Sequence, residues 1–94
     1  MFIVSLTYQC DLDAIDAALP AHVQWLKNAY ANGQLIASGR KIPRTGGVLL
    51  SKLTSRDELD ALLAADPFYQ QQLARYEVIE FEASMVAAGY EVLQ

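Results

Sequence analysis

The sequence is poor in the residues on which many kinds of active site depend. Among its 94 residues it has one cysteine, Cys10, and one histidine, His22. A single cysteine excludes a disulfide within the chain and favours a reducing, cytoplasmic location. No two residues have the spacing of paired metal ligands, so we expect no metal site. The glycines match neither the dinucleotide-binding nor the phosphate-loop motif, so we also expect no cofactor.

Basic residues and long apolar runs are scarce as well. Seven Lys and Arg residues are outnumbered by eleven Asp and Glu residues, which gives a net charge of −4 without any basic run. We therefore expect no nucleic-acid partner. No stretch approaches the ~18 continuous apolar residues of a membrane-spanning helix. The apolar start, residues 1–8, lacks the basic residues of a signal peptide, so we expect no membrane partner either.

Hydrophobic side chains, in contrast, are abundant and make up 53% of the residues. A chain of this length is long enough for one compact domain and too short for two. We expect a single domain over residues 1–94, with its core in 1–83 and a C-terminal tail in 84–94. A domain this small buries only roughly 60 to 65% of the surface that its unfolded chain exposes, which favours association between copies.

Alternation of apolar residues, many of them β-branched, predicts four strands. They are expected over residues 1–8, 34–42, 47–53 and 75–83. The segment from Pro43 to Gly46 has the composition of a tight turn, so the second and third strands should form a hairpin.

Capping and breaking residues predict the helices between these strands. Asp11 is a candidate N-cap for a short helical turn, and Pro20 fits the first position of a stronger helix that ends at Asn32. Thr54 or Ser55 should cap a second helix, which should break at Asp66-Pro67, where another turn over residues 68–73 should begin. The apolar stripe of the first helix has His22 on its shoulder and consists of Leu19, Val23, Leu26 and Tyr30.

The order strand, helix, strand, strand, helix, strand predicts an α+β fold. It is the ferredoxin-like βαββαβ arrangement, in which two helices cover one face of an antiparallel sheet. The other face would carry Ile3, Leu50 and either Leu35 or Ile36. Because that face is partly apolar, we expect a homodimer that packs sheet on sheet, with the tail crossing over to the other copy.

His22 and Asp66 are the candidate catalytic pair, because each lies near the beginning of a helix on the same face of the expected sheet. An aspartate that accepts from one imidazole nitrogen fixes the tautomer and leaves the other nitrogen free to move a proton. Structural roles stay open, because Asp66 before Pro67 is typical of a helix N-cap and His22 can be a polar residue at the core edge. Cys10 is either a thiolate beside His22 or, more simply, a small buried residue.

Three basic residues gather near the predicted hairpin: Arg40, Lys41 and Arg44. We expect Arg40 and Ser38, which share a strand face, to bind the acidic group of an anionic substrate. Alternatively, these charges mark a solvated sheet edge that discourages the addition of another strand.

Four short motifs occur in an order that resembles the YciI-like (YCII-related) family across residues 1–81. They are Pro20-Ala21-His22, Gly33, Ala37-Ser38-Gly39 and Asp66-Pro67-Phe68 before the closing strand. The resemblance implies a ferredoxin-like dimeric α/β barrel. It also implies an active-site pair at His22 and Asp66, and elimination chemistry on small cyclic acids. The chain departs from the family in having Arg40 where many relatives have proline, and in its tail.

We therefore expect a small cytoplasmic enzyme that needs no cofactor and acts on a small anionic organic molecule. The expected chemistry is proton transfer or elimination, of a lyase, dehydrochlorinase-like or isomerase type. His22 would act as general base or acid and Asp66 would orient it. The alternative is a noncatalytic dimeric ligand-binding or accessory module that uses the same pocket.

Overall fold

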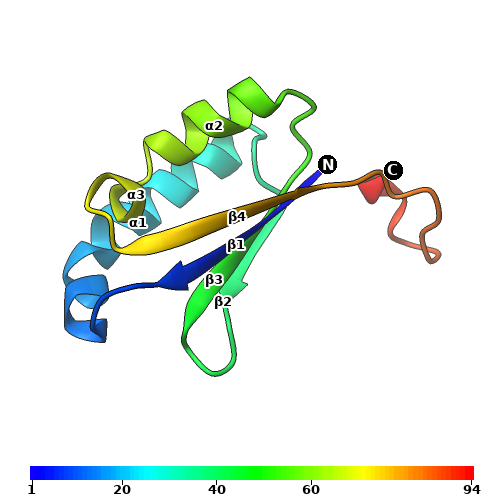
Figure 1. Ribbon diagram of the computed structural model, residues 1–94. Coiled ribbons are helices and arrows are strands. Elements are labelled where there is room, and N and C mark those ends of the chain that lie inside the picture. Colours follow the sequence, from blue (N-terminus) through cyan, green and yellow to red (C-terminus); the bar gives the residue numbers. More distant parts are fainter.

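The computed structural model describes all 94 residues and contains one four-stranded sheet with three helices (Figure 1). The predicted order of elements is confirmed, and the turn expected after the second main helix forms a short helix. In chain order the elements are β1 (Phe2–Tyr8), α1 (Leu12–Ala31), β2 (Ala37–Arg40), β3 (Gly46–Ser51), α2 (Arg56–Ala64), α3 (Pro67–Gln70), β4 (Ala74–Glu80) and the 3₁₀ turn η1 (Glu91–Leu93).

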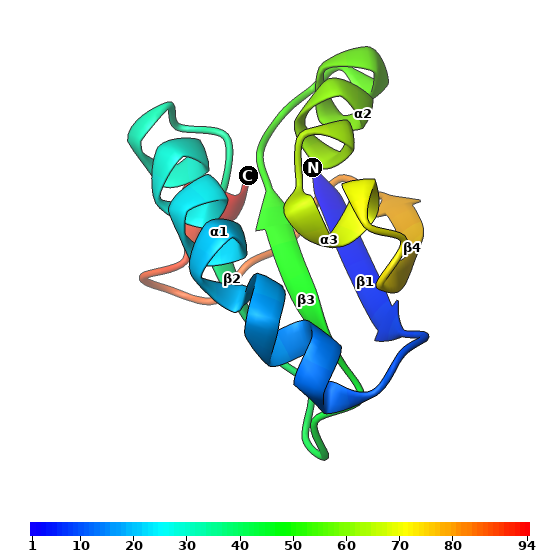
Figure 2. The ribbon, with the colours of Figure 1, turned by 90° about the vertical axis from the view of Figure 1, so that its left-hand side faces the viewer.

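The strands lie in the order β2-β3-β1-β4, and every neighbouring pair is antiparallel. This is the predicted ferredoxin-like α+β arrangement. All three helices lie on the same side of the sheet (Figures 1 and 2). The side chains of Phe2, Val4 and Leu6 on β1 point to that side and are buried, whereas Ile3 and its alternate neighbours point away. The core therefore lies in the single layer between the sheet and the helices.

Helix α1 differs from the prediction, because Pro20 lies inside it and does not begin it. The helix begins after Asp11, whose side chain accepts a hydrogen bond from the backbone N–H of Ala14. Proline has no backbone N–H, so the hydrogen bond to the carbonyl of Asp16, four residues earlier, is missing. Asp16 is exposed, so water can bond to this carbonyl instead. Buried side chains before and after Pro20 hold both halves of the helix on one core.

The buried face of α1 also differs from the predicted stripe. Its buried residues are Ile15, Ala18, His22, Trp25 and Ala29. Of the predicted stripe, Leu19, Val23 and Leu26 are only half-buried, and Tyr30 is 39% exposed. The buried face therefore runs along the neighbouring side of the helix. His22 lies at its centre, and the half-buried residues border an open space.

The uncovered face of the sheet carries an apolar row across all four strands. Strand register aligns Ala37 on β2 with Leu50 on β3, Leu50 with Ile3 on β1, and Ile3 with Ile79 on β4. Ile79 is 54% exposed. Of the two residues expected as alternatives on this face, Leu35 and Ile36, Leu35 is instead buried in the core.

The C-terminal tail leaves the sheet beyond β4 and extends past the end of the strands (Figure 1). The Lys52 ammonium donates hydrogen bonds to the backbone oxygens of Val92 and Gln94, which fixes the end of the tail to the segment after β3. None of the three helices combines the length with the apolar character needed to cross a membrane.

Candidate functional site

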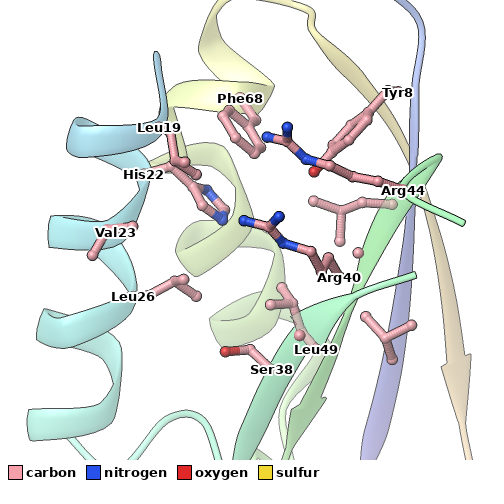
Figure 3. A pocket seen from close by; sticks show the side chains of 14 residues that line it. Tyr8, Leu19, His22, Val23, Leu26, Ser38, Arg40, Arg44, Leu49 and Phe68 are labelled. Atoms are coloured by element: carbon pink, nitrogen blue, oxygen red, sulfur yellow. The ribbon is translucent and has the colours of Figure 1, made fainter. Parts of the chain in front are cut away.

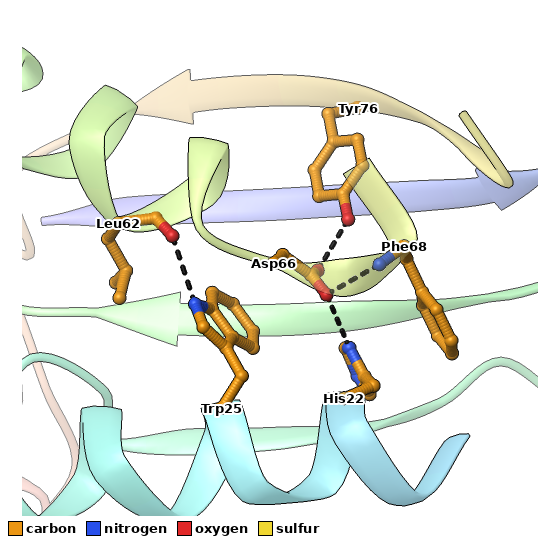
Figure 4. Close-up of polar contacts among 6 residues, drawn as sticks. All are labelled: His22, Trp25, Leu62, Asp66, Phe68 and Tyr76. Carbon is orange, nitrogen blue, oxygen red and sulfur yellow. Dashed lines mark hydrogen bonds and ion pairs between the residues drawn. The ribbon is translucent and has the colours of Figure 1, made fainter. Parts of the chain in front are cut away.

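Asp66 joins α1 to α3 through one carboxylate oxygen. The side chain of Asp66 is fully buried. The next residue, Pro67, has a fixed φ that suits the first turn of α3. Oδ1 of Asp66 accepts the backbone N–H of Phe68 at 3.0 Å, as an N-cap does, and lies 2.7 Å from Nδ1 of His22 (Figure 4). The N-cap and the histidine contact, which the sequence leaves as alternatives, are both present.

Tyr76 on β4 provides a third donor to the same carboxylate, since its hydroxyl donates to Oδ2 of Asp66 (Figure 4). Burial, together with the hydrogen bond to Asp66, raises the pKa of Tyr76 far above its ordinary value of 10.0. The tyrosine therefore remains a neutral donor. A buried carboxylate with three donors is held rigidly, because each of its bonds comes from a different element.

The imidazole of His22 is held between aromatic rings. Its ring stacks on Phe68 with centroids 3.9 Å apart and planes 4° apart, and on Trp25 at 5.5 Å. Trp25 is itself fixed, because its indole N–H donates to the backbone oxygen of Leu62. With Nδ1 bonded to Asp66, Nε2 has no protein partner, and the ring edge points into a cavity (Figure 3).

This cavity has a volume of about 290 Å³ and lies between α1 and the hairpin of β2 and β3. Its walls are mostly apolar: Leu19, Val23 and Leu26 come from α1, and Leu49 comes from β3 (Figure 3). The three leucine and valine side chains of α1 are the half-buried residues that the sequence predicted as core. A cavity of this size and lining suits a small organic ligand with an apolar body.

The polar side of the cavity is cationic. Ser38 and Arg40, predicted to bind the substrate, both line it, and so does Arg44 (Figure 3). The hydroxyls of Ser38 and Tyr30 are 2.6 Å apart, which ties β2 to the end of α1. Arg40 makes no ion pair, whereas Arg44 is 2.6 Å from the carboxylate of Asp16.

Sequence reasoning missed Tyr76 and the pairing of Arg44 with Asp16. A tyrosine in an alternating strand carries no signal of its own, because any half-buried strand position suits it. Arg44 and Asp16 are 28 residues apart and meet only because the hairpin folds back toward α1. Only the three-dimensional fold brings these groups together.

The other candidates from the sequence lie elsewhere. The thiol of Cys10 is 3.5 Å from the backbone oxygen of Leu73 and does not line the cavity. Cys10 is half-buried shortly after β1, and not fully buried as the simpler alternative expected. The Lys41 ammonium lies 3.3 Å from the hydroxyl of Thr7 and also stays outside the cavity. No three His, Cys, Asp or Glu side chains gather in a way that would hold a metal ion.

Comparison with known proteins identifies the family and the fold of this chain. No curated protein matches the chain. Among solved structures, it is similar to 5-chloro-2-hydroxyhydroquinone dehydrochlorinase from Burkholderia phenoliruptrix AC1100, in complex with 2,5-dihydroxybenzoquinone. The TM-score is 0.75 and the identity 20%, over 85% of this chain and 91% of that one. That likeness shows a shared fold. The model of the YCII-related domain matches residues 1–82, and the chain therefore belongs to the YCII-related domain family.

Proposed function

We propose that this protein is an enzyme that carries out proton transfer or elimination, of the lyase type, on a small anionic organic substrate. The observation that carries the proposal is the short contact between Nδ1 of His22 and the buried carboxylate of Asp66, with Nε2 free at the wall of a ligand-sized cavity. Family membership and the shared fold with a dehydrochlorinase support the same class of chemistry.

In this proposal Nε2 of His22 is the atom that moves the proton. Asp66 accepts from Nδ1–H, so the neutral ring has its lone pair on Nε2, directed at the cavity. Nε2 removes a proton from the substrate while the electrons of the broken bond expel a leaving group on the neighbouring atom. The Asp66 carboxylate stabilises the imidazolium formed in this step.

In this proposal the substrate is bound by the wall of the cavity opposite His22, which β2 and β3 form. Arg40 and Ser38 bind its acidic group, and the apolar side chains of α1 contact its body. Arg40 is free to do so, because no carboxylate of the protein pairs with it. Proton transfer followed by elimination requires no metal or nucleotide, since the base and the charge stabilisation come from side chains.

The experiment is a substrate screen with matched variants. The wild type is incubated with 5-chloro-2-hydroxyhydroquinone, small lactones and hydroxy acids, and released chloride and new ultraviolet absorbance are recorded. We expect turnover that falls at least about 100-fold in His22→Gln, the usual effect of losing a general base. The control is Gln24→Glu on the exposed side of α1, which should retain turnover.

Two results would contradict the proposal. Turnover that persists in His22→Gln would mean that another group is the base. Compounds that bind the cavity tightly and emerge unchanged would favour the noncatalytic ligand-binding module instead. Circular dichroism of His22→Gln separates a chemical defect from unfolding.

We also infer that the protein is a homodimer that packs its open sheet faces together. The support is the apolar row of Ala37, Leu50, Ile3 and Ile79, which crosses the uncovered face of the sheet. Sheets bury such rows against another layer, because exposed contiguous apolar surface is unfavourable in water. A cytoplasmic location is the accompanying expectation, given the single unpaired cysteine.

A further inference from the structure

Tyr76 contacts the candidate catalytic pair without lining the cavity. Strand register places it opposite Leu6, whose side chain is buried beneath the helices, so the tyrosine side chain points to the same side of the sheet. Its hydroxyl donates to Oδ2 of Asp66 (Figure 4), and the residue is absent from the cavity wall. Tyr76 can therefore act on a substrate in the cavity only through Asp66.

Asp66 is buried without a lysine or arginine beside it. Its side chain is 0% exposed, and its only ion-pair partner is His22. A buried carboxylate is unfavourable unless hydrogen bonds replace those of the lost water. The negative charge of Asp66 therefore depends on the three groups that donate to it.

These donors are divided unequally between the two carboxylate oxygens. Oδ1 accepts the backbone N–H of Phe68 and faces Nδ1 of His22. Oδ2 accepts only the hydroxyl of Tyr76. Without that hydroxyl, Oδ2 would be a buried anionic oxygen with no donor, and a proton on the carboxyl group would remove the unfavourable charge.

A proton for the carboxyl group becomes available when His22 takes one from the substrate on Nε2. The ring is then an imidazolium, and its Nδ1 lies 2.7 Å from Oδ1 of Asp66. The same protons have two arrangements. Either Nδ1 keeps its proton beside a carboxylate, or that proton moves to Asp66 and leaves a neutral ring with a proton on Nε2. A neutral imidazole holds this last proton tightly, so the second arrangement would prevent release of the substrate's proton.

We propose that Tyr76 is a positioning residue that keeps the Nδ1 proton on His22 throughout the reaction. Its hydrogen bond to Oδ2 stabilises the carboxylate, and because the two oxygens share one charge, Oδ1 becomes a weaker acceptor for a whole proton. The same bond fixes the plane of the carboxylate, whose terminal torsion is otherwise broad. This inference rests on the proposed function, because it assigns a role in the same proton transfer.

The first test is nitrogen NMR of His22 in the wild type and in Tyr76→Phe. A ring nitrogen with a proton and one without it resonate at clearly different positions. The pH is lowered until the Nε2 resonance shows that this nitrogen has taken up a proton, which reproduces the ring after proton abstraction. In the wild type we expect Nδ1 to keep the resonance of a protonated nitrogen. In Tyr76→Phe its resonance should move toward that of an unprotonated nitrogen.

Tyr69→Phe is the matched control. Tyr69 on α3 packs edge-to-face on Tyr76 with ring centroids 5.5 Å apart, but Asp66 accepts nothing from its hydroxyl. This variant should give the Nδ1 resonance of the wild type. The proposal is overturned if Nδ1 in Tyr76→Phe, shown by circular dichroism to be folded, stays at the wild-type position. It is also overturned if Nδ1 of the wild type loses its proton.

A second replacement keeps the test decisive if Tyr76→Phe does not fold. Incorporation of 3-fluorotyrosine at position 76 retains the ring and the hydroxyl, and the electron-withdrawing fluorine makes the hydroxyl a stronger donor. Oδ1 of Asp66 then accepts the Nδ1–H of His22 more weakly, so the resonance of this proton should move upfield. A merely structural role of Tyr76 predicts no movement, and that result would overturn the proposal.

Kinetics connect the role of Tyr76 to turnover. With a compound that the wild type turns over, Tyr76→Phe should lower kcat about tenfold, the effect of one charge-assisted hydrogen bond, and change KM less than about twofold. The NMR measurements need no substrate. If Nδ1 responds to Tyr76 but no compound is turned over, the role of Tyr76 stands and the enzymatic function fails. If turnover depends on His22 but Nδ1 is unchanged in Tyr76→Phe, only the role of Tyr76 fails.

Discussion

Oδ1 of Asp66 accepts hydrogen bonds from two groups at once, the backbone N–H of Phe68 and the imidazole Nδ1 of His22. One atom therefore caps α3 and orients the histidine. Because Phe68 also stacks on the imidazole, the start of α3 determines both the position and the tautomer of the ring. Substitutions at these positions should change structure and chemistry together, and the experiments below separate the two.

Replacing Asp66 by asparagine tests whether its charge acts on His22. The amide side chain retains an oxygen for the N–H of Phe68 but loses the negative charge, so an imidazolium beside it is less stable. We expect the ring resonances of His22 in NMR spectra to move relative to the wild type, because the group bonded to Nδ1 changes. His22 is the only histidine, so these resonances need no further assignment.

Ser55→Ala is the matched control for Asp66→Asn. Ser55 caps α2 by accepting the backbone N–H of Glu58, and it does not contact the histidine. Its loss should lower the free energy of unfolding by about 1 kcal/mol and leave the His22 ring resonances unchanged. Coincident ring resonances for the wild type and Asp66→Asn would reduce Asp66 to a helix cap.

Tyr76 should make the protein less stable at high pH. Burial, with the hydrogen bond to Asp66, raises its pKa in the folded state, so above pH 10 the unfolded chain loses this proton while the folded protein keeps it. The free energy of unfolding should therefore fall by about 1.4 kcal/mol per pH unit above pH 10 through this group. Below pH 10 the contribution is fully present and constant.

Urea denaturation of the wild type and of Tyr76→Phe at pH 8, 10 and 11 measures this effect. Other groups that titrate at high pH contribute equally to both proteins, so the difference between them isolates Tyr76. At pH 8 we expect the variant to be about 1 kcal/mol less stable, because a hydrogen bond to Asp66 is lost. That deficit should shrink at pH 11; a deficit independent of pH would refute the linkage.

Gly46 is required by the close approach of β3 to β1. A Cβ atom at this position would lie 1.8 Å from the backbone oxygen of Leu6. Gly46→Ala should therefore lower the free energy of unfolding by at least about 2 kcal/mol, as overpacking against rigid backbone does. Gly39→Ala is the control, because a Cβ there meets nothing within 4 Å. Similar denaturation midpoints for the two variants would contradict this explanation.

The proposed dimer predicts that a charge at Ile79 separates the copies. Ile79 ends the apolar row on the open face, and a buried unpaired carboxylate there is strongly unfavourable. Light scattering should give the wild type twice the 10.4 kDa of one chain and Ile79→Glu the mass of one chain. Leu12→Glu, on the helix side and also exposed, should stay dimeric. A wild type of 10.4 kDa would refute the dimer.

The sequence predicts the fold well, because the periodicity of apolar residues and the positions of turn-forming and helix-ending residues are local features. Alternation in residues 2–8 and the turn residues around Pro43 indicate the strands and hairpin that the structure contains. Pro20 misleads for the same reason. Its local preference is for the first turn of a helix. In the structure Ile15 before Pro20 and Trp25 after it are both buried, so α1 continues through the proline.

The site was predicted in part. His22 and Asp66 were identified from helix positions and family resemblance, and the structure brings them within 2.7 Å. The sequence misplaced the buried face of α1, because the apolar stripe borders the cavity and the actual buried face includes His22. A helical pattern shows which residues are apolar, but an apolar residue packs equally well against a core or around a ligand.

The sequence by itself determined the order of elements, the antiparallel ferredoxin-like fold and the residue types available for chemistry, since these follow from local propensity and composition. The tertiary structure alone decided which groups meet. It placed the hydroxyl of Tyr76 on Asp66 and Asp16 on Arg44. Such contacts join elements distant in sequence, and their energies depend on burial and distance, which no local pattern encodes.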